Sequence, residues 1–176
     1  MADIHQFIRS YRDHLSTFKR TSFDDDNHQF LCSDESQSVL AFDDIIKEKY
    51  PDPNIRPKSF DALYIHENYL FCVEFKNQKK PDKQEIAGKL VDGKRELEVL
   101  LAELNISRDR YRFVFCLVYN KHIPHEERYK PGLYRSIRFE YLNQYIQKGV
   151  VDAVFTENVD FFTRQFKKQL RKELAC

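Results

Sequence analysis

Apolar and aromatic residues dominate two short stretches near the middle of the chain, 60–66 and 69–76, which are separated by the polar pair Glu67-Asn68. Both stretches are rich in aromatic and branched side chains, which strands favour. The pattern therefore predicts two β-strands joined by a tight connection.

The connection decides which residues of this hairpin face each other. If it is the two-residue loop, or any loop symmetric about it, His66 pairs with Tyr69 and Asp61 lies directly opposite Glu74. Paired side chains have Cβ atoms about 4.5–5.5 Å apart. Lys76 lies two residues beyond Glu74 and points to the same face. A shift of one residue in the pairing would send Asp61 to the other side of the pair.

Apolar residues recur at helical spacing in several further segments. We expect helices at 2–18, 33–49, 82–104, 133–147 and 161–175. Ser33 is suited to cap the second of these, and Pro81-Asp82 opens the third. Gly93 lies on the apolar stripe of the third helix, where a glycine costs about 1 kcal/mol relative to alanine. A close approach of this helix to the sheet explains that glycine.

Two more segments have the composition of strands. Residues 111–119 form a continuous apolar run, which is typical of a central strand covered on both faces. The helix before it predicts a right-handed crossover, which makes this strand parallel to the strand of Glu74. Residues 150–156 predict a short edge or fifth strand. The chain is therefore expected to form a single α/β domain with a central mixed sheet and helices on both sides.

The facing carboxylates indicate a function. Asp61 and Glu74 would repel each other across the hairpin and destabilise the sheet. A hard divalent cation removes that penalty, because it prefers clustered oxygen ligands. A lysine beside the ion, here Lys76, can orient or deprotonate a water and neutralise charge on a phosphate. These residues predict a metal-assisted phosphodiesterase site. The alternative is an exposed strand face with ordinary charged residues.

The order of Asp61, a hairpin, Glu74-Phe75-Lys76, a long helix and another apolar strand resembles the PD-(D/E)XK nuclease superfamily, which has the restriction-endonuclease-like fold. The core of that family is a helix, three strands, a helix and a fourth strand (αβββαβ). Here it would cover roughly 33–120. The N-terminal helix, the C-terminal helix-strand-helix and Phe60, where the family pattern has a proline, are departures from the core pattern.

The resemblance implies a metal site for Mg²⁺ or Mn²⁺. Asp61, Glu74 and the backbone carbonyl of Phe75 would hold the ion. Many members of the family add a third acid from the first core helix, and Glu35 is the residue that matches it here. A glutamate in the first turn that only suits the helix dipole is the alternative.

The resemblance also implies catalytic residues. Lys76 would position the attacking water and stabilise the transition state, and Gln84 would be an extra catalytic residue at the start of the second core helix. Some basic residues are placed to contact a nucleic-acid backbone. They are Lys79, Lys80 and Lys83 near that helix start, and Arg164 and Lys168 on the last helix. Lysines and arginines favoured by the helix dipole are the alternative for the last helix.

The bulk composition limits these interpretations. The chain has 176 residues and a net charge of +1, so a nuclease of this kind needs local basic patches. The four cysteines show no CxxC spacing, and we expect buried free thiols in a reducing compartment, without zinc or disulfides. No signal peptide or membrane-spanning run is evident. A cytoplasmic protein is expected. The triple aspartate 24–26 and the pair His122 and His125 are interpreted as loop residues.

Two other classes of function stay open. The chain could be an inactive nuclease-fold module that binds a protein partner, such as an antitoxin, immunity protein or assembly subunit. It could also bind nucleic acid through its aromatic and basic residues without cleaving it. The sequence does not distinguish DNA from RNA as the substrate. A homodimer is also left open, because many enzymes that cut both strands dimerise.

Overall fold

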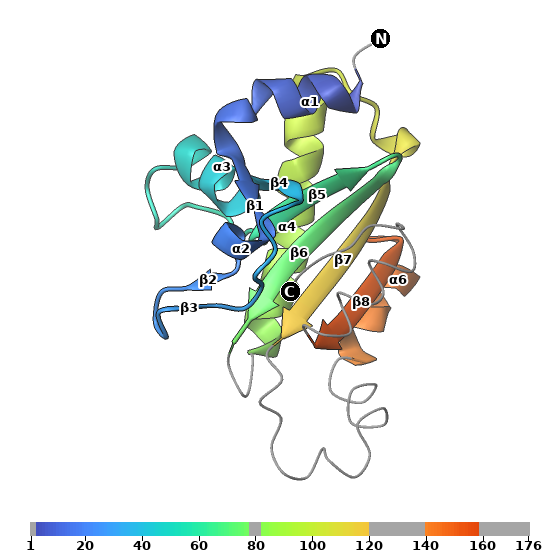
Figure 1. Cartoon of the computed structure of the whole chain (residues 1–176). Coiled ribbons are helices and arrows are strands. Elements are labelled where there is room, and N and C mark those ends of the chain that lie inside the picture. Colours follow the sequence, from blue (N-terminus) through green and yellow to red (C-terminus); the bar gives the residue numbers. More distant parts are fainter. Residues whose placement is uncertain (1–2, 78–81, 120–139, 159–176) are drawn as a thin grey trace.

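The computed structural model describes residues 3–77, 82–119 and 140–158. Its centre is a six-stranded mixed sheet with the order β1-β4-β5-β6-β7-β8 (Figure 1). The strands are β1 Leu15–Thr17, β4 Ser38–Ala41, β5 Ala62–His66, β6 Tyr69–Lys76, β7 Arg112–Tyr119 and β8 Ala153–Asn158. Neighbouring strands are antiparallel from β1 to β6 and parallel from β6 to β8. The expected α/β fold with a mixed sheet is confirmed.

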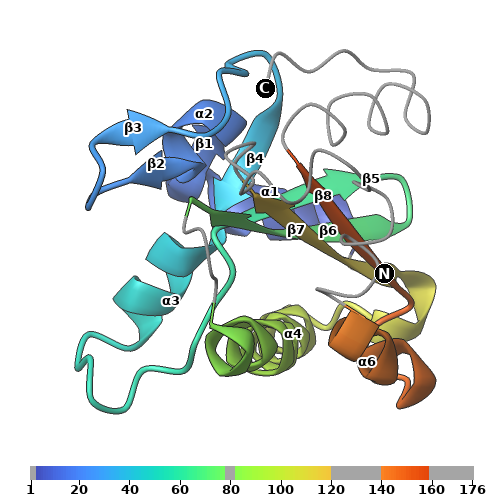
Figure 2. The same ribbon diagram turned by 90° about the horizontal axis from the view of Figure 1, so that it is seen from below.

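Helices cover both faces of this sheet. The α-helices are α1 Ile4–Ser10, α2 Phe18–Thr21, α3 Phe42–Lys49, α4 Lys83–Glu103 and α6 Asn143–Gln147. The short 3₁₀ helices are η1 Arg12–His14, η2 Arg108–Arg110 and η4 Glu140–Leu142. Figure 2 shows α3, α4 and α6 on one face, with α2 and a small hairpin on the other. That hairpin consists of β2 Phe23–Asp24 and β3 Gln29–Phe30.

The central hairpin has the predicted register. His66 pairs with Tyr69, and the ladder runs on to the pair of Ala62 and Val73. Glu67 takes a positive φ of 52° in the two-residue connection, as tight hairpin turns require. Asp61 directly precedes β5, so the continued register places it beside Glu74.

Two apolar layers bury the middle strands. On one face Leu63, Cys72 and Phe115 pack with the inward side of α4, and on the other Val73 and Cys116 belong to a second cluster. Both layers use alternate residues of the same strands, which explains the continuous apolar run of β7. The prediction of a central strand parallel to the strand of Glu74 is confirmed.

Two predicted helices begin or end elsewhere. The segment 33–49 is helical only from Phe42, because residues 38–41 form β4 and pair with β5, with Leu40 opposite Leu63. The segment 2–18 is an α-helix only over Ile4–Ser10. Leu15 begins the edge strand β1, and Phe18 begins the short helix α2. Of the triple aspartate 24–26, which was expected in a loop, Asp24 lies in β2. For β1 and β4, pairing with strands that are distant in the sequence outweighs the local periodicity, whereas β2 pairs with the nearby β3.

The C-terminal third is described only in part. The predicted strand at 150–156 is observed as β8, two to three residues later. Of the predicted helix 133–147, the described part is helical from Glu140. The predicted helix 161–175 and the loop with His122 and His125 lie outside the described residues. Among the described helices, none is both long and apolar enough to cross a bilayer.

The cysteines differ from the expectation in one respect. Cys72 and Cys116 are free and buried, as expected, but Cys32 is disulfide-bonded. The expectation of no disulfides is therefore wrong for Cys32. Disulfides persist mainly in oxidising compartments. The cysteines thus no longer support a cytoplasmic location.

Candidate active site

The central hairpin brings two carboxylates together, as its register predicts. The Asp61 Oδ2 atom accepts a hydrogen bond of 2.7 Å from the backbone N–H of Phe75, the residue that follows Glu74. This bond holds the Asp61 side chain against β6. Asp61 keeps 22% of its side chain exposed, whereas the Glu74 side chain is fully buried. Asp61 is thus the acid that solvent reaches, with Glu74 behind it.

Glu74 lies between two ammonium groups. Its Oε1 atom is 3.1 Å from Lys76 Nζ and 2.8 Å from Lys89 Nζ. Its Oε2 atom accepts a hydrogen bond of 3.0 Å from Lys89. Despite the two short ionic contacts, Oε1 is a buried oxygen to which no described donor is correctly oriented. One oxygen of Glu74 is therefore electrostatically paired but not hydrogen-bonded.

Lys76 is held by acids on two elements. Besides Glu74, its Nζ atom contacts Glu85 Oε1 on α4 at 2.6 Å. Burial opposes the charge of Lys76, but Glu74 and the hydrogen bond to Glu85 outweigh burial and raise its pKa. Lys76 therefore stays an ammonium. It can donate hydrogen bonds and offset negative charge, but it is not suited to remove a proton from water.

The two carboxylates resist carrying charge together. Burial raises the pKa of Glu74 to about 8, and the neighbouring Asp61 carboxylate adds to the shift. Burial also raises the pKa of Asp61, although Lys89 and the Phe75 N–H work against that rise. A further positive charge between the two acids would stabilise both in the ionised form.

Lys89 and Glu85 are two site residues that the sequence pattern had not predicted. Lys89 lies three residues after Ile86 and four before Gly93, both of which face inward on α4. Glu85 is one turn before Lys89. Glu85 and Lys89 are four residues apart and lie beside the buried face of α4. This spacing of two charged residues next to the apolar positions is the sequence pattern that could have identified them.

Two hollows meet at Asp61. One has a volume of about 260 Å³ and also contains Lys76 and Glu85, and the other, of about 280 Å³, is bordered by α3. Both include Phe23 of the β2–β3 hairpin. Several acidic side chains line their walls together with Arg20, Lys47 and Lys76. These acids are Asp24, Asp25, Asp26, Asp43 and Asp44. A ligand that reaches Asp61 thus passes mixed charges rather than a basic surface.

The other predicted site residues lie elsewhere. Glu35 is in the segment between β3 and β4 rather than on a helix, and its carboxylate pairs with Lys19 at 2.6 Å. Gln84 is exposed in the first turn of α4, where its backbone N–H binds the cap residue Asp82. Lys83 places its ammonium over the ring of Tyr141, 5.3 Å from the ring centre. Lys79, Lys80, Arg164 and Lys168 lie outside the described residues.

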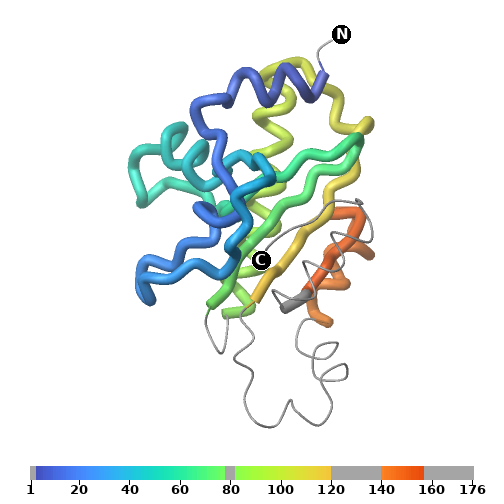
Figure 3. Tube along the Cα trace, viewed as in Figure 1, coloured from blue at the N-terminus to red at the C-terminus, as the bar shows by residue number. Residues whose placement is uncertain are grey.

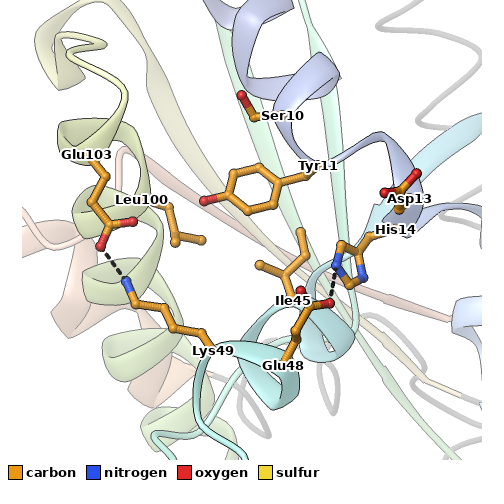
Figure 4. A pocket seen from close by; sticks show the side chains of 9 residues that line it. All are labelled: Ser10, Tyr11, Asp13, His14, Ile45, Glu48, Lys49, Leu100 and Glu103. Carbon is orange, nitrogen blue, oxygen red and sulfur yellow. Dashed lines mark hydrogen bonds and ion pairs between the residues drawn. The ribbon is translucent and has the colours of Figure 1, made fainter.

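A third hollow, of about 350 Å³, lies between the N-terminal segment, α3 and the C-terminal end of α4 (Figure 4). Two polar contacts border it, His14 Nε2 to Glu48 at 2.9 Å and the ion pair of Lys49 with Glu103 at 2.7 Å. It contains none of the predicted site residues. The tube in Figure 3 shows that its elements lie near the end of the molecule that carries α1, away from the start of α4. These two contacts link the N-terminal segment to α3 and α3 to α4.

The chain matches no family model, and comparison with curated proteins and with solved structures gives no match either. Within residues 3–77, 82–119 and 140–158, no group of three or more His, Cys, Asp or Glu side chains is arranged to hold a metal ion. The resemblance to the nuclease superfamily thus depends on the motif residues and on the order of the elements around them.

Proposed function

We propose that the protein hydrolyses phosphodiester bonds of nucleic acid with the help of Mg²⁺ or Mn²⁺. One observation carries the proposal. Asp61, directly before β5, lies beside Glu74 of the neighbouring strand β6, and the ammonium of Lys76 is 3.1 Å from Glu74. This is the set of groups that the chemistry needs: two hard oxygen ligands and a fixed positive charge.

The side chains at this position fit a divalent ion. Asp61 and Glu74 would hold it, with the backbone carbonyl of Phe75 as a further ligand. The buried Oε1 atom of Glu74 has no correctly oriented hydrogen-bond donor, and burial disfavours two negative charges at this place. When bound, such an ion polarises the scissile phosphate and lowers the pKa of its water.

The other catalytic roles, which are to orient the water and to stabilise negative charge on the phosphate, would belong to side chains and backbone groups of the protein. Lys76 stays positively charged and would donate a hydrogen bond to the attacking water or to a phosphate oxygen. Glu85 orients Lys76, because it binds the same ammonium at 2.6 Å. The Phe75 N–H keeps Asp61 turned toward Glu74. Each group would therefore be in position before a substrate arrives, which lowers the cost of reorganisation.

A second candidate function is supported by the position of Lys89. Its ammonium contacts Glu74 at 2.8 Å and Asp61 at 3.5 Å, so the two acids are already neutralised. The same cluster would then be a structural ion-pair network in an inactive module that binds a protein partner. The acidic walls of the neighbouring hollows are consistent with this function, since they do not favour a polyanion.

Cleavage assays separate the two functions. Single- and double-stranded DNA and RNA are incubated with Mg²⁺, Mn²⁺ or EDTA and with wild type, Glu74→Gln, Lys76→Met or Lys94→Met. We expect cleavage that EDTA abolishes and that the first two substitutions lower by about 10²–10³-fold. Lys94→Met is the matched control, because Lys94 lies on α4 but pairs with Glu98. Metal-dependent cleavage that survives both site substitutions would show that the assigned site is wrong. If no substrate is cut, the inactive module is favoured.

A further inference from the structure

Lys89 is the described side chain that contacts both carboxylates of the site. It projects from the second turn of α4. Its Nζ atom is 2.8 Å from Glu74 Oε1, 3.0 Å from Glu74 Oε2 and 3.5 Å from Asp61 Oδ1. The contact is largely shielded from water, since only 20% of the Lys89 side chain is exposed. An ammonium held by three carboxylate oxygens occupies the place where a cation is most stabilised.

A divalent ion could not share this place with the ammonium. Mg²⁺, Mn²⁺ and similar ions bind carboxylate oxygens at about 2.0–2.6 Å. Lys89 Nζ already lies against the same oxygens, at 2.8 and 3.0 Å from Glu74. Two positive charges this close would also repel each other strongly in a buried environment. Binding of the ion therefore requires Lys89 to move.

We propose that Lys89 is an internal counter-ion that competes with the divalent ion for Asp61 and Glu74, so that it sets the metal affinity of the site. This inference rests on the proposed metal-dependent function. In the metal-free protein Lys89 keeps the buried Glu74 and the partly exposed Asp61 together, and it leaves when the ion binds. The apparent affinity for metal is lower by the free energy needed to displace it.

The surroundings of Lys89 permit this movement. Its charge sits on a flexible four-carbon stem. A third acid, Asp43 near the start of α3, is also close enough to favour the charged form of Lys89. Burial opposes that charge, and Glu74 and Asp61 favour it more strongly than Asp43 does. Asp43 lies at the edge of one of the hollows that reach Asp61. The displaced ammonium therefore has an acidic partner on the solvent side of the site.

The neighbouring Lys76 does not have this role. It contacts Glu74 but has no described contact with Asp61, and Glu85 on α4 holds it at 2.6 Å. Lys76 can therefore keep its position while an ion is bound, whereas Lys89 cannot. The two lysines differ in function: Lys76 is the fixed charge and Lys89 is the exchangeable one.

Calorimetric titration with Mn²⁺ tests the competition. We expect Lys89→Met to bind Mn²⁺ about tenfold more tightly than wild type, because the competing charge is gone. Lys94→Met, on the same helix and paired with Glu98, should bind like wild type. In EDTA, Lys89→Met should melt at a lower temperature than wild type, because the two acids lose their counter-ion. Equal or weaker Mn²⁺ binding by Lys89→Met would overturn the inference.

A second measurement uses the wild-type protein, in case Lys89→Met does not fold. Lysines are acylated with an amine-reactive reagent with and without Mn²⁺, and the modified peptides are quantified by mass spectrometry. Mn²⁺ should raise the labelling of Lys89 relative to that of Lys94, and an unchanged or lower ratio contradicts the competition. Absence of Mn²⁺ binding to wild type would overturn both this inference and the proposed function. Metal-dependent cleavage with unchanged Lys89 labelling would overturn this inference alone.

Discussion

At the scale of single residues, Glu85 is the group that positions Lys76. The Lys76 ammonium lies 2.6 Å from Glu85, and this hydrogen bond lowers the pKa of Glu85. We expect Glu85→Gln to lower kcat about tenfold with little change in KM, because the ammonium keeps its charge but loses an orienting partner. Lys76→Met should cost more.

Glu98→Gln is the control for that prediction. Glu98 lies on the same helix and also accepts a lysine ammonium, from Lys94 at 2.6 Å. Its substitution should leave kcat unchanged. An equal loss of kcat in Glu85→Gln and Glu98→Gln would indicate a general effect on α4 rather than positioning of Lys76.

Asp43 gives the stability of the fold a defined pH dependence. Its Oδ2 atom contacts Lys47 Nζ at 2.7 Å, and Ser59 donates a hydrogen bond to Oδ1. Burial opposes the charge of Asp43, but these two partners outweigh burial and lower its pKa below 3.8. The stabilisation is therefore present above the unfolded-state pKa and is lost as the pH falls through the lower, folded-state value.

We expect Asp43→Asn to lower the free energy of unfolding by about 1 kcal/mol near neutral pH. The difference from wild type should shrink below about pH 4. Urea unfolding of both proteins at several pH values measures this difference. A gap that is constant with pH, or that widens in acid, would show that the ionised Asp43 does not stabilise the fold.

The residues of the site illustrate what the sequence can predict. Asp61, Glu74 and Lys76 were identified correctly as neighbours, because a symmetric two-residue connection determines the pairing of a short hairpin. Lys89 was not identified, since its position depends on how α4 lies across the sheet. Glu35 was assigned to a helix that begins seven residues later, at Phe42.

At the scale of elements, two glycines of α4, Gly88 and Gly93, allow the packing of this helix to be tested with the same substitution at two positions. A Cβ atom added at Gly93 would lie 2.7 Å from the Phe60 ring and 3.3 Å from its backbone nitrogen. A Cβ atom at Gly88 would meet the flexible side chain of Lys58, also at 2.7 Å. The Phe60 ring cannot retreat easily, because it is fully buried and stacked on Phe42 with the ring centres 4.1 Å apart.

We therefore expect opposite effects from the same substitution. Gly93→Ala should lower the free energy of unfolding by about 1–3 kcal/mol through overpacking. Gly88→Ala should be neutral or stabilise by up to about 1 kcal/mol, because Lys58 can move and alanine favours the helix. Denaturant unfolding measures both. Equal effects of the two substitutions would contradict the close approach of α4 to Phe60.

The elements themselves were predicted best where the pattern is long. The helix α4 and the strands β6 and β7 agree with the expected segments within about two residues, because each has a sustained period or a long apolar run. The short strands β1 and β4 were missed. β1 pairs with β4, and β4 pairs with both β1 and β5, and no short window of sequence around either strand contains its partners.

At the scale of the whole molecule, the topology was more predictable than the extent of the sheet. A hairpin followed by a helix and a buried strand leads to a parallel pair through the right-handed crossover rule. That rule says nothing about additional strands at the edges. The N-terminal segment expected as a helical addition supplies the edge strand β1, so it completes the sheet beside β4.

Metal binding should raise the stability of the whole fold, because Glu74 lies on β6 and Asp61 directly before β5, in the buried middle of the sheet. A ligand that binds only the folded state stabilises it by about 2.7 kcal/mol at a concentration 100 times its Kd. For a chain of this size, each kcal/mol raises Tm by about 2–4 °C. Saturating Mn²⁺ should therefore raise the Tm of the wild type by about 5–10 °C relative to EDTA.

Two aspartates near the site make this experiment specific. Asp61→Asn should lose most of the rise in Tm, because it removes one of the two facing carboxylates. Asp44→Asn should keep the rise, although Asp44 borders the same hollow, because its carboxylate points to Lys47 at 3.5 Å. If both variants keep the full rise, Mn²⁺ stabilises the protein from another place. If both lose it, Mn²⁺ binding depends on the total negative charge of the hollow rather than on the facing carboxylates of Asp61 and Glu74.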